Sequence, residues 1–291
     1  MPVRPALVIE LTRFFLDRIY IGALSFQLKT MPEIARFLPR ILRRRLSRAL
    51  QAVGYQVIPT SQMYRLDGLN TVHSARFRKD PRFQAARQRA LQASQGVDPG
   101  TEWRIHVGLW AASLASRVPG EFVECGVNVG FLSSAILRYL DWANLGKKFY
   151  LVDTFAGPVL EQFSAEEIAR GNLQKVKQSL AAGAYVTDLE RVRQNYAEWE
   201  RIEIVQGAVP QVLPSVDAQA LAFLHIDMNC AHPEVEALRF FWDRISAGGI
   251  VLLDDYAYYG YDSQGDAMDA LAGTLGCQIL ALPTGQGMII K

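Results

Sequence analysis

The arrangement of apolar and polar residues changes near residue 118. Before that point apolar residues recur at helical spacing, and we predict helices over 5–30, 33–53, 80–96 and 101–117. The intervening segment 54–75 contains Pro59, Gly68 and Asn70, so we expect it to be irregular. After residue 118, short β-rich runs alternate with helical stretches such as 131–145 and 233–246. The chain therefore combines a helical N-terminal part with a longer α/β part.

The β-rich runs of the second part predict its topology. Alternation of strands and helices is typical of a parallel sheet with helices on both faces. The last two runs are joined only by 283–286, which is too short for a parallel crossover, so we predict that this pair is antiparallel. The expected fold is α/β, a doubly wound, Rossmann-like, seven-stranded and mostly parallel sheet with an antiparallel C-terminal hairpin and an α-helical N-terminal extension. The seven runs are Glu121–Cys125, Phe149–Asp153, Ile202–Gln206, Leu221–Asp227, Ile250–Asp254, Cys277–Leu282 and Gly287–Ile290.

Composition narrows the class of protein. The chain has 291 residues, of which 50% are hydrophobic and 21% charged, as in an ordinary globular protein. These values exclude a disordered chain, a collagen-like fibre and a disulfide scaffold. The three cysteines include no closely spaced pair, which indicates free thiols in a reducing compartment. We find neither a good signal peptide nor a transmembrane segment, and we expect a cytoplasmic protein.

Charge is unevenly distributed along the chain. Residues 1–100 contain 17 Lys and Arg against 6 Asp and Glu, whereas residues 101–291 contain 14 against 23. We therefore predict a basic helical extension over 1–100 and a separate domain over 101–291. The densest basic segment, 36–48, is expected to dock on the acidic domain or on a partner subunit. The alternatives are peripheral contact with an anionic membrane and nucleic-acid binding, and of these we expect no nucleic-acid binding.

A glycine-containing turn follows the first strand of the predicted sheet. Its pattern is ExGxxxG, from Glu124 through Gly126 to Gly130, and it differs from the GxGxxG pattern that binds dinucleotides. Ser133 follows in the first turn of the next helix. A ligand with an amino-acid tail and a sulfonium group suits this turn better than a diphosphate. At the end of the next strand, Asp153 can accept ribose hydroxyls and Phe155 can stack on an adenine.

Carboxylates also end two later strands. Adjacent strand ends should bring Asp227 close to Asp254 and Asp255, where the three charges repel one another unless a cation lies among them. Oxygen ligands of this kind suit Mg²⁺, Ca²⁺ or Mn²⁺, and such an ion could activate a substrate hydroxyl. Asp227 could also act as general base. We expect His225 to be a core histidine, and His232, at a predicted helix start, could assist as a base.

With these residues in hand, the segment from Pro119 to Lys291 resembles the TylF-type, or macrocin, O-methyltransferases, a branch of the class I S-adenosylmethionine-dependent methyltransferases. The matching segments are PGEFVECGVNVG, FYLVDTFAG, VQGAVPQVLP, LHIDMN and GGIVLLDDY. The chain departs from the family pattern at Asn128-Val129 in the first turn and at Met228-Asn229, directly after the strand that ends in Asp227.

The resemblance implies a role for each matched position. Glu124, Gly126 and Gly130 would contact the methionine end of S-adenosylmethionine, Asp153 its ribose, and the segment Gln206, Gly207 and Ala208 its adenine. Asp227, Asp254 and Asp255 would bind Mg²⁺, with Asp227 as the base. The implied reaction is methylation of a hydroxyl on a sugar or glycosylated metabolite by a homo-oligomeric enzyme. The alternatives are a catalytically degenerate scaffold and an NAD-dependent oxidoreductase, and the ExGxxxG turn counts against the second.

Overall fold

The computed structural model describes residues 44–45, 48, 51–52, 54 and 63–291. The chain divides into two units, Met1–Met63 and Tyr64–Lys291, and the second contains the sheet and the helices that cover it. Of the helix predicted over 33–53, residues 44, 45, 48, 51 and 52 are described and are helical. The helix predicted over 5–30 lies outside the described residues, as does most of the basic segment 36–48.

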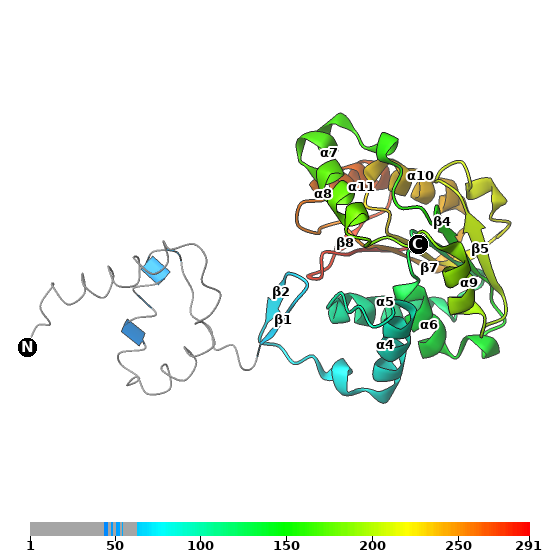
Figure 1. Ribbon diagram of the computed structural model, residues 1–291, viewed down its shortest axis with the longest axis horizontal. Coiled ribbons are helices and arrows are strands. Elements are labelled where there is room, and N and C mark those ends of the chain that lie inside the picture. Colours follow the sequence, from blue (N-terminus) through cyan, green and yellow to red (C-terminus); the bar gives the residue numbers. More distant parts are fainter. Residues whose placement is uncertain (1–43, 46–47, 49–50, 53, 55–62) are drawn as a thin grey trace, which may run out of the picture. The chain divides into compact units, whose positions relative to one another are not determined.

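A seven-stranded sheet forms the centre of the second unit (Figure 1), and its strand order is β5-β4-β3-β6-β7-β9-β8. The first five strands in this order are parallel, and β9 is antiparallel to both β7 and β8. The predicted mostly parallel sheet with a C-terminal antiparallel pair is therefore confirmed. The strands are β3 (Glu121–Cys125), β4 (Phe149–Asp153), β5 (Ile202–Gln206), β6 (Leu221–Ile226), β7 (Ile245–Leu253), β8 (Leu280–Ala281) and β9 (Gly287–Ile290).

Helices cover both faces of the sheet (Figure 1), as the alternating pattern predicts. On one face α5 and α6 pack against the strands, and α4 packs on α6. On the other face α10 packs against both β6 and α11. The helices are α4 (Pro81–Ala93), α5 (Glu102–Ala115), α6 (Phe131–Leu140), α7 (Ala165–Ala169), α8 (Asn172–Ala181), α9 (Leu189–Tyr196), α10 (Ala231–Phe241) and α11 (Asp262–Leu275). Short 3₁₀ turns are η2 (Arg76–Lys79), η3 (Trp142–Asn144), η4 (Leu160–Gln162), η5 (Leu213–Ser215) and η6 (Trp242–Arg244).

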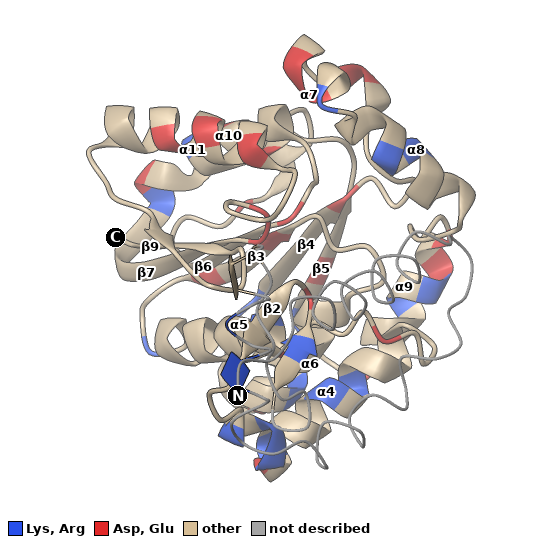
Figure 2. Ribbon diagram, turned by 90° about the vertical axis from the view of Figure 1, so that its left-hand side faces the viewer, with Lys and Arg blue, Asp and Glu red and all other residues tan. Residues whose placement is uncertain are grey.

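Helix α4 precedes residue 100 and yet belongs to the same compact unit as the sheet. Its start is set locally, because the side chain of Asp80 accepts a hydrogen bond from the Arg82 amide and Pro81 occupies the first turn. It buries Phe83, Ala86 and Ala90. Figure 2 shows basic residues gathered on α4. The division into 1–100 and 101–291 stays a prediction.

A short antiparallel hairpin lies where we expected irregular structure. Strands β1 (Tyr64–Leu66) and β2 (Leu69–Thr71) are joined by Asp67 and Gly68, which both have positive φ, 53° and 70°. An Asp-Gly pair is favoured in such two-residue turns because both positions need the left-handed region. The prediction of irregular structure over 54–75 is wrong here, since strands of three residues carry little periodic signal. The hairpin matters because Asp67 is part of the site.

None of the helices among the described residues combines the length and the apolar character that a membrane span requires.

Candidate active site

The site lies at the carboxyl ends of β3 and β6. Strands β4 and β5 are added on one side of β3, whereas β6 and β7 are added on the other side. Such a switch point is where open α/β sheets bind ligands. Glu124 on β3 is in register with His225 on β6, and both side chains are almost completely buried. The Asp227 amide donates to the Cys125 carbonyl at 2.8 Å, which ties the end of β6 to that of β3.

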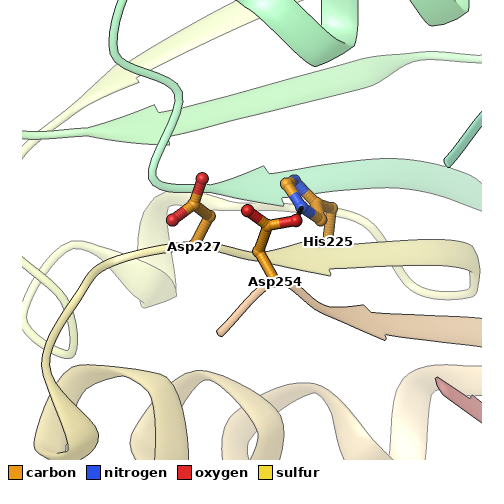
Figure 3. A group of neighbouring side chains, drawn as sticks. All are labelled: His225, Asp227 and Asp254. Carbon is orange, nitrogen blue, oxygen red and sulfur yellow. Dashed lines mark ion pairs between the residues drawn. The ribbon is translucent and has the colours of Figure 1, made fainter. Parts of the chain in front are cut away.

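The predicted convergence of strand-end carboxylates is observed. One ligand atom each from His225, Asp227 and Asp254 lie within 4.8 Å of one another. Figure 3 shows these three side chains at the ends of β6 and β7. We call them the strand-end cluster. Asp255 follows Asp254 directly and is also buried, but its carboxylate is bonded elsewhere.

Arg104 on α5 is the partner of the Asp255 carboxylate. Its Nη2 lies 3.0 Å from Asp255 Oδ1, its Nη1 lies 2.5 Å from Asp254 Oδ2, and its Nε lies 3.1 Å from Asp67 Oδ2. The guanidinium also lies over the ring of Tyr258, 4.3 Å from its centroid. Arg104 was not predicted from the sequence, because an arginine on a helix carries no local signal of a partner 150 positions away.

The charges in this region shift one another's pKa values. Burial, together with the charges of Asp254 and Asp255, raises the pKa of Asp227 well above its usual value. Burial and Asp254 raise the pKa of Asp255 to about 6. Burial alone would raise the pKa of Asp254 too. Arg104 and His225 outweigh burial and hold the pKa of that carboxyl well below its usual range. A carboxyl with a raised pKa can accept a proton, so the cluster favours Asp227 as the base.

A pocket opens beside the cluster at the glycine turn. Its lining includes Gly126, Asp153, Gly207 and Asp227, four of the residues singled out from the sequence. Gly126 has φ +89°, and a Cβ there would lie 1.8 Å from the Asp227 carbonyl oxygen. Only glycine therefore allows the turn to pass this close to the end of β6. Further lining residues are Asn128, Val152, Thr154, Gly157, Pro158, Val159, Gln162, Tyr185, Val186, Val209, Met228, Asn229, Cys230 and Pro233.

Asp153 both lines the pocket and holds the turn. Its Oδ2 accepts hydrogen bonds from the amides of Val127 and Asn128 at 2.7 and 2.8 Å. Its Oδ1 accepts from the Phe155 amide at 2.7 Å and from the Thr154 hydroxyl at 3.3 Å. The longer of these bonds is weak. Oδ1 therefore keeps capacity for one further donor.

Asn128 occupies a position that departs from the family pattern, and its side chain bonds to the backbone of a neighbouring segment. Its Oδ1 accepts from the Val186 amide at 2.8 Å, and its Nδ2 donates to the Ala184 carbonyl at 3.0 Å. These two bonds hold the segment that carries Tyr185 against the turn. Tyr185 lines the pocket, and burial with the charge of Asp227 raises the pKa of its phenol to about 12. Tyr185 was not among the residues predicted from the sequence.

Several predicted residues lie outside the pocket lining among the described residues. Glu124 is buried and bonded to His225, and Gly130 begins α6. Ser133 and Phe155 are buried in the core, and the Ser133 hydroxyl is bonded to that of Tyr196 at 2.7 Å. His232 is exposed on the first turn of α10 and belongs to neither the pocket lining nor the strand-end cluster. Gln206 and Ala208 flank Gly207 without lining the pocket themselves.

The strand order, the C-terminal antiparallel pair and the switch-point pocket define a class I methyltransferase fold. The family profile described as Macrocin-O-methyltransferase (TylF) matches residues 109–267, so the chain belongs to this family. The resemblance that the sequence motifs indicate is thereby confirmed.

The chain is similar to two enzymes of known activity. The 8-demethyl-8-(2,3-dimethoxy-alpha-L-rhamnosyl)-tetracenomycin-C 4'-O-methyltransferase of Streptomyces olivaceus is 27% identical over 171 residues, 56% of this chain and 62% of that enzyme. The demethyldecarbamoylnovobiocin O-methyltransferase of Streptomyces niveus is 26% identical over 151 residues, 49% of this chain and 55% of that enzyme. The matched part thus spans less than two thirds of either relative.

A solved structure shares the fold. The structure of the O-methyltransferase NovP superposes with a TM-score of 0.55 and 21% sequence identity, over 65% of this chain and 79% of that one.

Proposed function

We propose that this protein is an S-adenosylmethionine-dependent O-methyltransferase that acts on a hydroxyl group of a sugar in a glycosylated metabolite. One observation carries the proposal. Asp227, the carboxylate best suited to accept a proton, lines the same pocket as the glycine turn and Asp153. Membership of the family and the acceptors in the names of the two relatives support the same activity. Neither the scaffold nor the oxidoreductase alternative is favoured by any of these observations.

The pocket suits S-adenosylmethionine. The turn at Gly126 lets the backbone come close to a ligand, Asp153 Oδ1 can accept one ribose hydroxyl, and the segment around Gly207 would border the adenine. Four predicted residues lie behind the pocket lining and would support the shape of the turn and the start of α6: Glu124, Gly130, Ser133 and Phe155. When bound, the cofactor supplies an electrophilic methyl group on a sulfonium sulfur.

In the proposed reaction the acceptor hydroxyl lies beside Asp227. Asp227 would take up the proton that this hydroxyl loses, and a bound S-adenosylmethionine would supply the methyl group that its oxygen gains. An in-line displacement depends mainly on holding the two reactants in the correct geometry. Tyr185 lines the pocket, and the phenol of Tyr261 lies close enough to Asp227 to be affected by its charge, so we expect these two tyrosines to contact the sugar. His232 would contact the acceptor only if the acceptor extended as far as the start of α10.

The residues present also fit a divalent cation. A buried imidazole nitrogen and two carboxylates converge within 4.8 Å, and burial of several like charges favours a counter-cation. Asp227 and Asp254 would hold such an ion, with Asp255 restrained by Arg104, and the ion would lower the pKa of the acceptor hydroxyl. Mg²⁺ assistance, homo-oligomer formation, cytoplasmic location and membrane contact through the basic segment stay predictions.

Calorimetric titration with S-adenosylmethionine, and with NAD as the control ligand, tests the cofactor. We expect micromolar binding of S-adenosylmethionine and none of NAD. Incubation with a panel of rhamnosides and a mass-spectrometric search for a single added methyl group then tests the reaction. A folded protein that binds no S-adenosylmethionine would contradict the proposal and favour the scaffold alternative.

A further inference from the structure

A tyrosine hydroxyl joins the β1–β2 hairpin to the loop between β7 and α11. The hydroxyl of Tyr258 donates to Asp67 Oδ1 at 3.0 Å, across 191 positions of the chain. The other carboxylate oxygen of Asp67 lies 3.1 Å from Arg104 Nε, and the Asp67 side chain is only 10% exposed. The hairpin precedes residues 109–267, which the family profile matches. The family profile therefore does not account for this contact.

The ring of Tyr258 is enclosed on further sides. The Arg104 guanidinium lies over the ring, 4.3 Å from its centroid. A Cβ at Gly285 would lie 2.8 Å from Tyr258 Cδ2, so a glycine is needed where the turn between β8 and β9 passes the ring. The Ala257 amide also donates to the Gly285 carbonyl at 2.7 Å. Loop 256–261 is thus attached to the hairpin, to α5 and to the edge of the sheet.

Tyr258 in turn places Tyr261 beside the strand-end cluster. The Tyr261 amide donates to the Tyr258 carbonyl at 3.0 Å, and the centroids of the two rings are 6.1 Å apart. The Lys175 ammonium of α8 lies 5.6 Å from the centroid of the Tyr261 ring. Burial and the nearby charges of Asp255 and Asp227 raise the pKa of the Tyr261 phenol. This phenol is therefore close to the proposed base.

We propose that Asp67 is a positioning residue for the acceptor. Through the hydroxyl of Tyr258 it holds loop 256–261 in place, and the loop then presents the Tyr261 phenol to an acceptor beside Asp227. A phenol that is fixed before the acceptor arrives can bind a sugar hydroxyl without the entropy loss of ordering the loop. This inference rests on the proposed function, because it takes the acceptor to lie beside Asp227.

Steady-state methylation of the rhamnoside that the wild type methylates fastest tests this role. Tyr258→Phe removes only the hydroxyl, and Asp67→Ala removes the carboxylate that accepts from it. Each should raise the KM for the rhamnoside roughly 3–10-fold, the usual effect of one hydrogen bond, with kcat and S-adenosylmethionine affinity nearly unchanged. Asp67→Asn keeps an oxygen for the hydroxyl and should recover most of this loss. The matched control is Tyr259→Phe, at a tyrosine of the same loop that is 93% exposed.

The double variant shows whether the two residues act together. If both act through their shared hydrogen bond, Asp67→Ala combined with Tyr258→Phe should raise KM no further than either change alone. Effects that multiply, or a wild-type KM in Tyr258→Phe, would overturn the proposal. Tyr258→Phe removes a single oxygen atom and carries the test if Asp67→Ala does not fold.

Amide hydrogen exchange separates this proposal from the proposed function, because it needs neither cofactor nor acceptor. The Tyr261 amide should exchange roughly 3–10-fold faster in Tyr258→Phe than in the wild type or in Tyr259→Phe. Equal exchange in the three proteins would show that the hydroxyl does not hold the loop, and would overturn the proposal. A wild-type protein that methylates no rhamnoside, while Tyr258→Phe still exchanges faster, would contradict the proposed function instead.

Discussion

Arg104 joins two consecutive carboxylates at the end of β7, with its Nη1 2.5 Å from Asp254 Oδ2 and its Nη2 3.0 Å from Asp255 Oδ1. The same guanidinium lies 3.1 Å from Asp67 in the β1–β2 hairpin. One side chain of α5 thus connects the hairpin, a covering helix and the carboxyl edge of the sheet. Because all of these groups are largely buried, the arrangement has consequences for stability as well as for the site.

Replacement of this arginine should destabilise the fold. Arg104→Gln leaves the carboxylates of Asp254 and Asp255 buried without their cation, and loss of one partner of a buried pair costs about 3–5 kcal/mol. Urea unfolding measures the change. The control is Arg193→Gln, whose exposed pair with Glu190 spans 3.7 Å and should contribute less than about 1 kcal/mol. Equal losses in the two variants would show that Arg104 is no more than a surface arginine.

Substitution of the proposed base should separate chemistry from binding. Asp227→Asn keeps the size of the side chain and removes its ability to take up the acceptor proton. We expect turnover to fall by about 10²–10⁴-fold, the usual contribution of a general base, with little change in the affinity for S-adenosylmethionine. Asp266→Asn, at an exposed position on α11, serves as the control. Turnover of Asp227→Asn within a few-fold of the wild type would remove the assigned role.

The glycine turn can be tested by adding a single carbon atom. In Gly126→Ala the new Cβ would meet the Asp227 carbonyl oxygen at 1.8 Å, at a φ of +89°. The left-handed conformation alone costs about 1–2 kcal/mol for a residue with a Cβ, so we expect S-adenosylmethionine affinity to fall at least roughly tenfold.

Gly273→Ala is the matched control for this change. Apart from its chain neighbours and the backbone of its own helix, no described atom lies within 4 Å of a Cβ at Gly273, which is inside α11. Alanine should leave cofactor affinity unchanged and stabilise the helix by about 0.5–1 kcal/mol. A Gly126→Ala protein that binds the cofactor normally would show that the turn does not contact it.

Glu234 on α10 should make stability depend on pH. Burial, followed by the charge of Asp255, raises the pKa of its carboxyl to about 8 from the usual 4.5. The folded state therefore retains a proton that the unfolded state loses, so stability should fall as pH rises from 5 to 8. The slope approaches about 1.4 kcal/mol per pH unit.

The isosteric variant Glu234→Gln should have a shallower slope, because its amide oxygen can still accept from Met228 and Gln264 without titrating, while Asp227 and Asp255 titrate as before. Urea midpoints at pH 5, 6.5 and 8 for both proteins measure the difference. Parallel curves would show that Glu234 is ionised in both states over this range.

Sequence alone determined the sheet and the edge where its acidic residues gather. Predicted strands at Glu121–Cys125, Phe149–Asp153 and Ile202–Gln206 coincide with β3, β4 and β5, because short apolar runs between polar breakers carry a local signal. Parallel strands end at one edge, so the convergence of Asp227 and Asp254 followed from topology. The hairpin at 64–71 escaped prediction because its strands are too short for a period to be visible.

Only the tertiary structure decided how those acids are partnered. Glu124 and His225 are 101 positions apart, and Arg104 is 150 positions from Asp254. Their pairing depends on how β6 lies beside β3 and how α5 lies across the strand ends. An arginine on a helix or a histidine in an apolar strand looks the same in sequence whether or not a partner faces it. Three similar carboxylates thereby acquire different partners: Asp254 is bonded to both Arg104 and Gln286, Asp255 is bonded to Arg104, and Asp227 is bonded to neither.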